Sequence, residues 1–462
     1  RSTLFPYTTL FRSSYTFILV TLFAVSAVSA VENVTDDAIG MEMSNDASSA
    51  ENDIKTVSED NGSDVGTFDE LSDQINSSAI GGVLNLTKDY KFVNGDNNGI
   101  MINKTITING NNHKLDGSNQ SRIFALFDGN ITLNNLVLVN GFADNGGAIF
   151  VNKTVTCNNV VFENNYAKKG GAIYTNSNIT LDNCIFNGGY AEYGAAIYAH
   201  TPPQEKYEVY GPVDDLDDNN PDDNNTNASE EEKNSAYEQI IRNKGGILYP
   251  EDSNRTYYCK ITNSMFKNFY DICLATIYLE YIQGLEVINS TFANSTSQYA
   301  TVCYADGGNQ RHINNSYMNL YASKTAGAFV VGESSDLIVD KCIFDNVTAS
   351  YDGGIIFSDG QGWKQGAKDE LIIKNTLIKK SKSTYGAVLT LCAGHLFIDN
   401  STIMDNEAEG NAIIYACEAE TKITNSTFKN NRIKITDDSP IDRAIIYIAR
   451  SEERRVGKEC RS

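Results

Sequence analysis

The feature that most constrains this chain is a short motif that recurs about every 25 residues along most of its length. The motif reads approximately T-[IL]-x-N-x-x-F, and a glycine-rich motif such as GGAIF at Gly146–Phe150 falls between its copies. Each repeat holds short runs of β-branched or aromatic residues broken by Asn, Gly or Asp, and none shows helical periodicity. The copies end at Leu138, Phe162, Phe186, Phe266, Phe292, Met318, Phe344, Ile378, Ile403 and Phe428.

A period of this length predicts an all-β fold, namely a right-handed parallel β-helix built as a solenoid of ~24–26-residue coils. Successive coils place equivalent side chains about 4.8 Å apart, so a repeated residue becomes a column. Asparagine tolerates a left-handed turn between strands, and its amide can bond the amides above and below it. We therefore expect a structural ladder, which Lys341 interrupts, of Asn135, Asn159, Asn183, Asn263, Asn289, Asn315, Asn375, Asn400 and Asn425.

The first coil of such a solenoid has an open edge that needs a cover. Residues 67–77, TFDELSDQINS, predict a short capping helix at this edge. Thr67 can cap the helix and Glu70 completes a capping box, while Phe68, Leu71 and Ile75 form an apolar stripe. The β-helix itself is expected to span residues 67–449.

The ends of the chain predict other kinds of segment. Residues 1–13 and 450–462 are expected to be artefacts, because residues at matching distances from the two ends can have reverse-complementary codons, as one translated sequencing adapter would give. Residues 14–30 predict a secretory signal peptide that ends in Val28-Ser29-Ala30, and residues 31–66 predict a disordered acidic linker. We therefore expect a secreted, cell-surface protein, joined to the cell envelope through a C-terminal anchor beyond the given sequence.

Charge and cysteine usage narrow the classes of partner. The formal net charge is −22, which argues against nucleic acid and anionic lipid as partners. The cysteines of the repeats form no C-x-x-C pair, and most lie in apolar strand patterns. We therefore expect buried free thiols rather than a metal site. Disulfide bonds between some of the cysteines are the alternative.

The glycine motif followed by F-x-x-N resembles the repeats of polymorphic outer-membrane proteins. It occurs as Gly146–Ile149 with Phe162–Asn165, and as Gly170–Ile173 with Phe186 and Asn187. Taken with the signal peptide, the acidic linker and the capping helix, residues 15–449 resemble the adhesin-like proteins of methanogenic archaea. This resemblance implies display on the cell surface and attachment to glycans or proteins of host or microbial surfaces.

Two insertions interrupt the repeats and carry the candidate binding residues. The first, at about residues 201–257, is acidic, and its candidate Ca²⁺ ligands lack EF-hand spacing, so a solvated loop is the alternative. The second, residues 358–370, contains Trp363, which could stack on a sugar beside Asp359 and Lys364 or fold over the coil below. No other cofactor is expected. The candidate Ca²⁺ ligands are Asp214, Asp215, Asp217 and Asp218.

These observations favour a non-catalytic, adhesin-like surface protein. The alternatives are a polysaccharide lyase or glycoside hydrolase on the same fold, and a structural component of the envelope. An enzyme of either kind needs acidic or basic side chains that converge on one face. The sequence indicates no such cluster, so no catalytic residue is assigned. Its four histidines are far apart, at His113, His200, His312 and His395.

Overall fold

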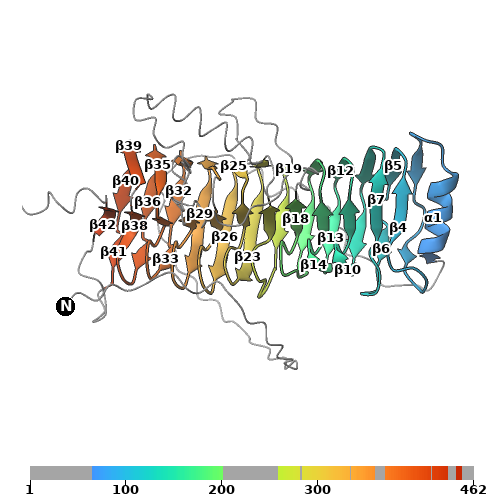
Figure 1. The fold of residues 1–462 in the computed structure, drawn as a ribbon, viewed down its shortest axis with the longest axis horizontal. Helices are drawn as coiled ribbons and strands as arrows, with labels where there is room; N and C mark the ends of the chain where they lie inside the picture. Colours follow the sequence, from blue (N-terminus) through green and yellow to red (C-terminus); the bar gives the residue numbers. More distant parts are fainter. Residues whose placement is uncertain are drawn as a thin grey trace, which may run out of the picture. The chain divides into compact units, whose positions relative to one another are not determined.

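The computed structural model describes residues 65–200, 259–280, 284–332, 335–358, 370–417, 419–434 and 444–449. Within these ranges the chain forms a parallel β-solenoid of about 12 turns with a single short helix, which confirms the predicted fold class. The coils follow one another in chain order from the helix to the last strand (Figure 1). The predicted signal peptide, nearly all of the predicted linker and the bulk of both insertions lie outside the described residues.

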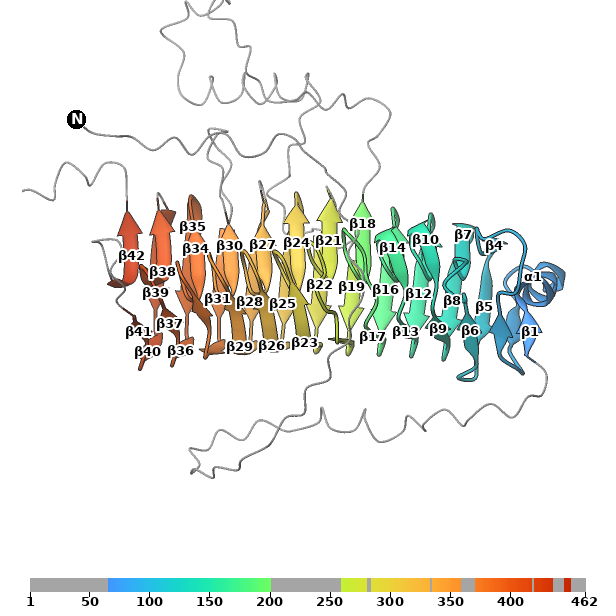
Figure 2. The same cartoon turned by 90° about the horizontal axis from the view of Figure 1, so that it is seen from below.

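Three parallel sheets, here called A, B and C, form the faces of the solenoid, and they run side by side along it in the second view (Figure 2). Sheet A contains β1 (Gly66–Thr67), β3 (Tyr90–Lys91), β6 (Lys114–Asp116), β9 (Val137–Val139), β13 (Val161–Glu163), β17 (Ile185–Asn187), β20 (Met265–Lys267), β23 (Thr291–Ser297), β26 (Ser316–Ala322), β29 (Ile343–Ala349), β32 (Leu377–Lys379), β36 (Thr402–Met404) and β40 (Thr427–Lys429), with the side strands β33 (Lys382–Ser383), β37 (Glu407–Ala408) and β41 (Arg432–Ile433).

Sheet B contains β2 (Val83–Asn85), β5 (Ile106–Asn109), β8 (Ile131–Asn134), β12 (Val155–Asn158), β16 (Ile179–Asp182), β19 (Cys259–Thr262), β22 (Gly284–Ile288), β25 (Asn309–Ile313), β28 (Leu337–Asp340), β31 (Glu370–Lys374), β35 (Gly394–Asp399) and β39 (Ala419–Thr424). Sheet C contains β4 (Ile100–Asn103), β7 (Phe124–Asp128), β11 (Ile149–Val151), β15 (Ile173–Thr175), β18 (Ile197–His200), β21 (Ile277–Glu280), β24 (Cys303–Asp306), β27 (Phe329–Val331), β30 (Ile356–Ser358), β34 (Leu389–Leu391), β38 (Ala412–Cys417) and β42 (Ala444–Ala449). A separate pair, β10 (Phe142–Asn145) and β14 (Tyr166–Lys169), lies between sheets A and C along the chain.

The helix α1 (Phe68–Ser77) covers the first coil as predicted. The Glu70 amide donates to Thr67 Oγ1 at 3.2 Å, and the Thr67 amide donates to Glu70 Oε2 at 3.3 Å, so the capping box is complete. Phe68, Leu71 and Ile75 are buried against the end of the solenoid. The helix therefore removes from water the apolar edge that the first coil would otherwise expose.

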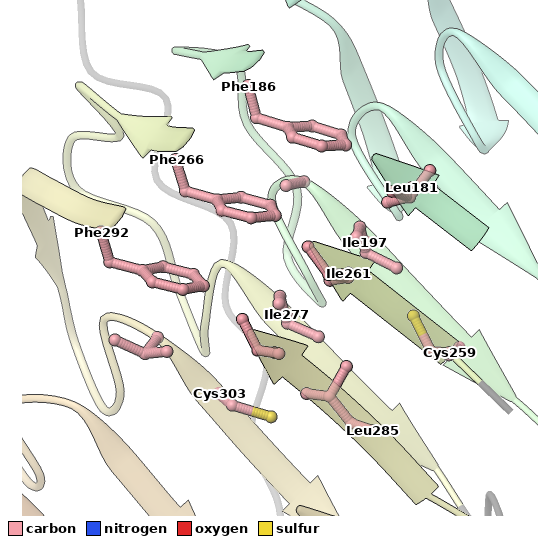
Figure 3. Packing of buried hydrophobic residues seen from close by; sticks show 14 of the residues in the cluster. Leu181, Phe186, Ile197, Cys259, Ile261, Phe266, Ile277, Leu285, Phe292 and Cys303 are labelled. Atoms are coloured by element: carbon pink, nitrogen blue, oxygen red, sulfur yellow. The ribbon is translucent and has the colours of Figure 1, made fainter. Parts of the chain in front are cut away.

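The interior is filled by side chains that repeat from coil to coil. Phe162, Phe186, Phe266 and Phe292 lie in register in sheet A, and successive ring centroids are 4.5–4.6 Å apart. Figure 3 shows Phe186, Phe266 and Phe292 one above another, with aliphatic side chains of sheets B and C beside them. Burying each ring contributes roughly 1.5–3 kcal/mol, so the column stabilises every coil that it joins.

Left-handed residues make the turn between sheet B and sheet A. Asn135, Asn159 and Asn183 have φ between 51° and 53°, a region that asparagine enters more readily than other L-residues. Lys341 occupies the same turn with φ 56°, which shows that the backbone keeps this conformation where the asparagine is replaced. A second left-handed turn follows five residues later, at Asn140, Asn164 and their equivalents.

One predicted ladder residue is wrong. Asn314, with φ 54°, occupies the turn position, and Asn315 is the next residue, with its side chain buried. The Asn315 Nδ2 donates to the Val287 carbonyl at 3.0 Å and to the Tyr317 hydroxyl at 3.2 Å. The motif in this coil therefore ends at Tyr317, which is paired with Phe292, and not at Met318.

Candidate functional site

The candidate binding residues of the two insertions cannot be placed. Trp363, Asp359 and Lys364 lie outside the described residues, and so do Asp214, Asp215, Asp217 and Asp218. Among the residues that are described, no group of three or more His, Cys, Asp or Glu side chains is arranged to hold a metal ion. No helix in the same part of the chain is long and apolar enough to cross a membrane.

The asparagines at the first turn are joined by side-chain hydrogen bonds. Asn159 Nδ2 donates to Asn135 Oδ1 at 3.0 Å, and Asn183 Nδ2 donates to Asn159 Oδ1 at 2.5 Å. The chain of amides is not continuous, because Asn263 donates to Asp182 Oδ1 at 2.8 Å. Because the amides bond one another, we assign this column a structural role in joining successive coils, and not a role in binding a ligand. The further members bond in the same way: Asn289 to Asn263, Asn314 to Asn289, Asn375 to Asp340, Asn400 to Asn375, and Asn425 to Asp399.

A column of exposed aromatic side chains lies just beyond the second turn. Phe142, Tyr166 and Tyr190 are in register in three successive coils, and Tyr270 belongs to the next coil. Their exposed fractions are 51%, 39%, 39% and 60% in that order, which is high for large apolar rings. We call these four residues the exposed aromatic column.

The column could have been found in the sequence. Each of its members lies four residues after the last residue of a repeat motif, at Leu138, Phe162, Phe186 and Phe266. Four residues beyond this inward-facing residue, the chain has passed the second left-handed turn. An aromatic residue at this offset is therefore placed on the outside of the solenoid, where burial does not explain it.

A groove opens beside Tyr190. Its volume is about 380 Å³. It lies where Gly188 and Gly189 occupy the second turn, with φ 66° and 99°. The lining residues are Asn164, Tyr166, Asn187, Gly188, Gly189, Tyr190, Asn268 and Tyr270.

The absence of a side chain at Gly188 opens this groove. The same turn position holds Asn164 in the preceding coil and Asn268 in the following one. Asn268 Nδ2 donates instead to Asn187 Oδ1 at 2.8 Å, and Asn187 Nδ2 donates to Glu163 Oε1 at 3.1 Å. The Asn164 side chain, which makes no hydrogen bond to another described residue, lines the groove, and its Oδ1 would lie 2.8 Å from a Cβ at position 188.

A second group of polar side chains converges at the ends of strands β18 and β21. Lys169 Nζ donates to the Tyr198 hydroxyl at 2.8 Å, and that hydroxyl donates to Glu280 Oε2. His200 Nδ1 lies 3.1 Å from Glu280 Oε2, and Lys169 Nζ lies 4.0 Å from it. We call Lys169, Tyr198, His200 and Glu280 the charged cluster. The sequence separates His200 from Glu280 by an insertion, and the pairing of β18 with β21 brings the two residues together.

Burial shifts two members of the charged cluster, Glu280 and His200, toward their neutral forms. Burial raises the pKa of Glu280, Lys169 opposes this shift, and Asp306 in the next coil adds to it. Burial lowers the pKa of His200, and the nearby Lys169 lowers it further. A carboxyl group with a raised pKa beside a second carboxylate is the chemistry from which a proton donor is made.

One member of the charged cluster, Tyr198, belongs to a stack of aromatic rings on sheet C. Phe150, Tyr174, Tyr198, Tyr278 and Tyr304 stack with neighbouring centroids 5.2–5.5 Å apart. Lys169 Nζ lies 4.6 Å from the centre of the Tyr198 ring, within the range of a cation–π contact. The stack fixes the position of the Tyr198 ring along the solenoid axis. It therefore also fixes the hydroxyl group that contacts Lys169 and Glu280.

The cysteines of the core are not candidates for nucleophiles. Cys157, Cys184, Cys259, Cys303 and Cys342 are free and buried, as expected from their strand positions. Burial raises the pKa of the Cys184 and Cys342 thiols to about 12. The thiolate form is therefore absent at neutral pH, and these side chains act as small apolar core residues.

Comparisons with known proteins find one distant structural similarity. No family model matches it, and no curated protein sequence matches it. Among solved structures it is similar to PfbA, a surface adhesin of Streptococcus pneumoniae, at 11% sequence identity and a TM-score of 0.25. The similarity covers 80% of this chain and 89% of that chain. Similarity of this degree does not transfer a function.

Proposed function

We propose that this protein is a cell-surface adhesin-like protein that attaches to surface glycans or proteins without altering them. The observation that carries the proposal is the exposed aromatic column. Four large rings stand on the outside of successive coils, and they are up to 60% exposed. Contiguous exposed apolar surface edged by polar groups marks interaction sites in soluble proteins.

The scaffold supports this role because it holds the rings in fixed positions. Phe142 lies on β10, which pairs with the β14 strand of Tyr166, and the coils of the three tyrosines are joined by stacked phenylalanines of sheet A. A binding surface on paired strands loses little conformational entropy when a ligand is bound. The chain is also strongly acidic, which disfavours nonspecific binding to anionic surfaces.

The second insertion provides a further contact under this proposal. Trp363 would stack on a sugar, and Asp359 and Lys364 would accept from and donate to its hydroxyl groups. The first insertion is the proposed place for Ca²⁺, with Asp214, Asp215, Asp217 and Asp218 as its ligands. Both remain predictions. Measuring attachment with Trp363→Ala, and again after chelation by EGTA, tests them separately.

An attachment assay tests the proposed function. The purified chain is fixed to beads, and the retention of microbial and host cells is counted against beads that carry a variant with Tyr166, Tyr190 and Tyr270 all replaced by alanine. We expect saturable retention of at least one cell type and a large loss with the variant. Circular dichroism and thermal unfolding confirm that the variant is folded. No retention of any cell by the unmodified chain would contradict the proposal.

A second candidate function is polysaccharide cleavage, and the charged cluster is the observation that favours it. Glu280, whose pKa is raised, would protonate the leaving oxygen, and Asp306 in the next coil would serve as the second carboxylate. Lys169 and His200 would orient Glu280. If cleavage occurs, Glu280→Gln should abolish it, because glutamine cannot donate the proton, whereas Tyr190→Ala should leave the reaction step intact.

A further inference from the structure

The groove over Gly188 has the chemistry of a sugar subsite. Three tyrosine rings, Tyr166, Tyr190 and Tyr270, supply apolar faces, and the amides of Asn164 and Asn187 supply donors and acceptors. None of the lining side chains is charged. A pyranose ring presents the complementary surface, with C–H faces above and below the ring and hydroxyl groups around its edge.

We infer that this groove binds one neutral pyranose unit of an extended glycan that lies along the exposed aromatic column. The inference rests on the proposed function and names the ligand of the same surface. The rings of the column recur once per coil, at about 4.8 Å, which is close to the length of one sugar unit in an extended chain. Successive sugars can therefore meet Phe142, Tyr166, Tyr190 and Tyr270 in turn.

The charge of the molecule selects neutral glycans. The chain has a formal net charge of −22, and Glu163 lies next to the groove, where it accepts a hydrogen bond from Asn187. A polyuronate would bring further carboxylates toward this acidic surface, and like charges repel. A neutral hexose or N-acetylhexosamine polymer meets no such repulsion.

The glycine at position 188 is not required by the backbone, and this allows a sharp test. Its φ of 66° lies close to the 51° of Asn164 and the 61° of Asn268, which occupy the equivalent position. The one close contact of a Cβ at this place would be Asn164 Oδ1, at 2.8 Å, which is the end of a flexible side chain, and the Asn268 carbonyl oxygen at 3.6 Å would be in ordinary van der Waals contact. Gly188→Asn therefore restores the residue type of the neighbouring coils and fills the groove. At Gly189, by contrast, a Cβ would meet the backbone oxygen of Asn165.

The test is calorimetric titration of the full chain with neutral hexose and N-acetylhexosamine oligosaccharides of two to six units, and with oligogalacturonates for comparison. We expect a neutral series to bind and to strengthen with length. Gly188→Asn and Tyr190→Ala should each weaken binding at least about tenfold. Tyr190→Phe should keep most of it, because the ring is retained. Tyr351→Ala, which removes an exposed tyrosine that follows β29 and lies outside the exposed aromatic column, is the matched control and should leave binding unchanged.

The outcomes separate this inference from the proposed function. Binding that Gly188→Asn and Tyr190→Ala leave unchanged, or a preference for oligogalacturonates, overturns the groove as a neutral-sugar subsite while attachment stands. Cell retention without binding of any neutral oligosaccharide also overturns the inference and leaves the proposed function intact. A chain that binds neither cells nor sugars contradicts both.

Discussion

At the scale of single residues, the left-handed turns decide which side chain each coil can carry. Asn159 has φ 53° and exchanges amide hydrogen bonds with Asn135 and Asn183. An L-residue other than asparagine or aspartate is strained in this region, whereas glycine is not. Asparagine therefore suits this turn mainly because it tolerates positive φ, and the hydrogen bonds between the amides add to that preference.

Substitution of Asn159 separates the two contributions. Asn159→Gly and Asn159→Ala both remove the amide, but only alanine is strained at positive φ. The glycine variant should therefore be more stable than the alanine variant by about 1 kcal/mol, measured as the free energy of urea unfolding. Equal stability of the two variants would show that the turn conformation is not what asparagine contributes.

His312 gives the fold a defined response to acid. Its ring is buried in the core, where Nδ1 lies 2.9 Å from the Tyr317 hydroxyl, and burial lowers its pKa to about 3. The unfolded chain takes up this proton below about pH 6.5 and the folded chain does not, so stability falls as pH falls through the window from about 6.5 to about 3. The loss is roughly 1.4 kcal/mol per pH unit.

Urea unfolding at pH 7.5 and pH 5.0 tests this response. Between the two pH values, His312→Gln should lose roughly 2 kcal/mol less stability than the unmodified chain, because glutamine does not titrate. The measurement at pH 7.5 serves as the internal reference for the cost of the substitution itself. If both proteins lose the same stability, the buried imidazole does not control the acid response.

At the scale of elements, the stacked phenylalanines hold successive coils together. Phe266 is buried between Phe186 and Phe292, with centroids 4.6 and 4.5 Å away. Phe266→Ala should lower the free energy of unfolding by roughly 3–5 kcal/mol, because it leaves a cavity in a column that cannot collapse. Tyr270→Ala removes an exposed ring from the same coil and should change stability by less than about 0.5 kcal/mol. Similar losses for the two variants would contradict the packing argument.

The elements were predictable because each depends on local residue types. The period of the repeat predicted the solenoid, and Thr67 with Glu70 predicted the capping helix. Both signals can be read from short segments of the sequence. The coil around Asn314 was misread because it has two consecutive asparagines, and either one fits the motif by type. Only the register of the aromatic, Tyr317 against Phe292, determines which asparagine turns the chain.

At the scale of the whole molecule, candidate sites arise where residues from distant coils meet. His200 and Glu280 are neighbours in paired strands although an insertion separates them in the sequence. The interval from Phe186 to Phe266 is the same as the interval from His200 to Glu280, so the repeat already contained this pairing. The groove at Gly188 was harder to predict, because it is made by the lack of a side chain between two coils.

The molecule therefore carries two surfaces with different chemistry. The exposed aromatic column offers apolar rings and amides, whereas the charged cluster offers Glu280 with a raised pKa beside Lys169 and His200. The first surface suits retention of a ligand, and the second contains groups that can move a proton. Attachment without chemical change is the central claim of the proposed function.

One measurement tests that claim most directly, and it reads retention and cleavage in the same sample. The purified chain is incubated with an immobilised panel of neutral and acidic polysaccharides, and both the retained protein and the released reducing ends or unsaturated products are quantified. We predict saturable retention that Tyr190→Ala weakens, with no product above that of a protein-free control. Released product that disappears with Glu280→Gln would contradict it and make the charged cluster an active site.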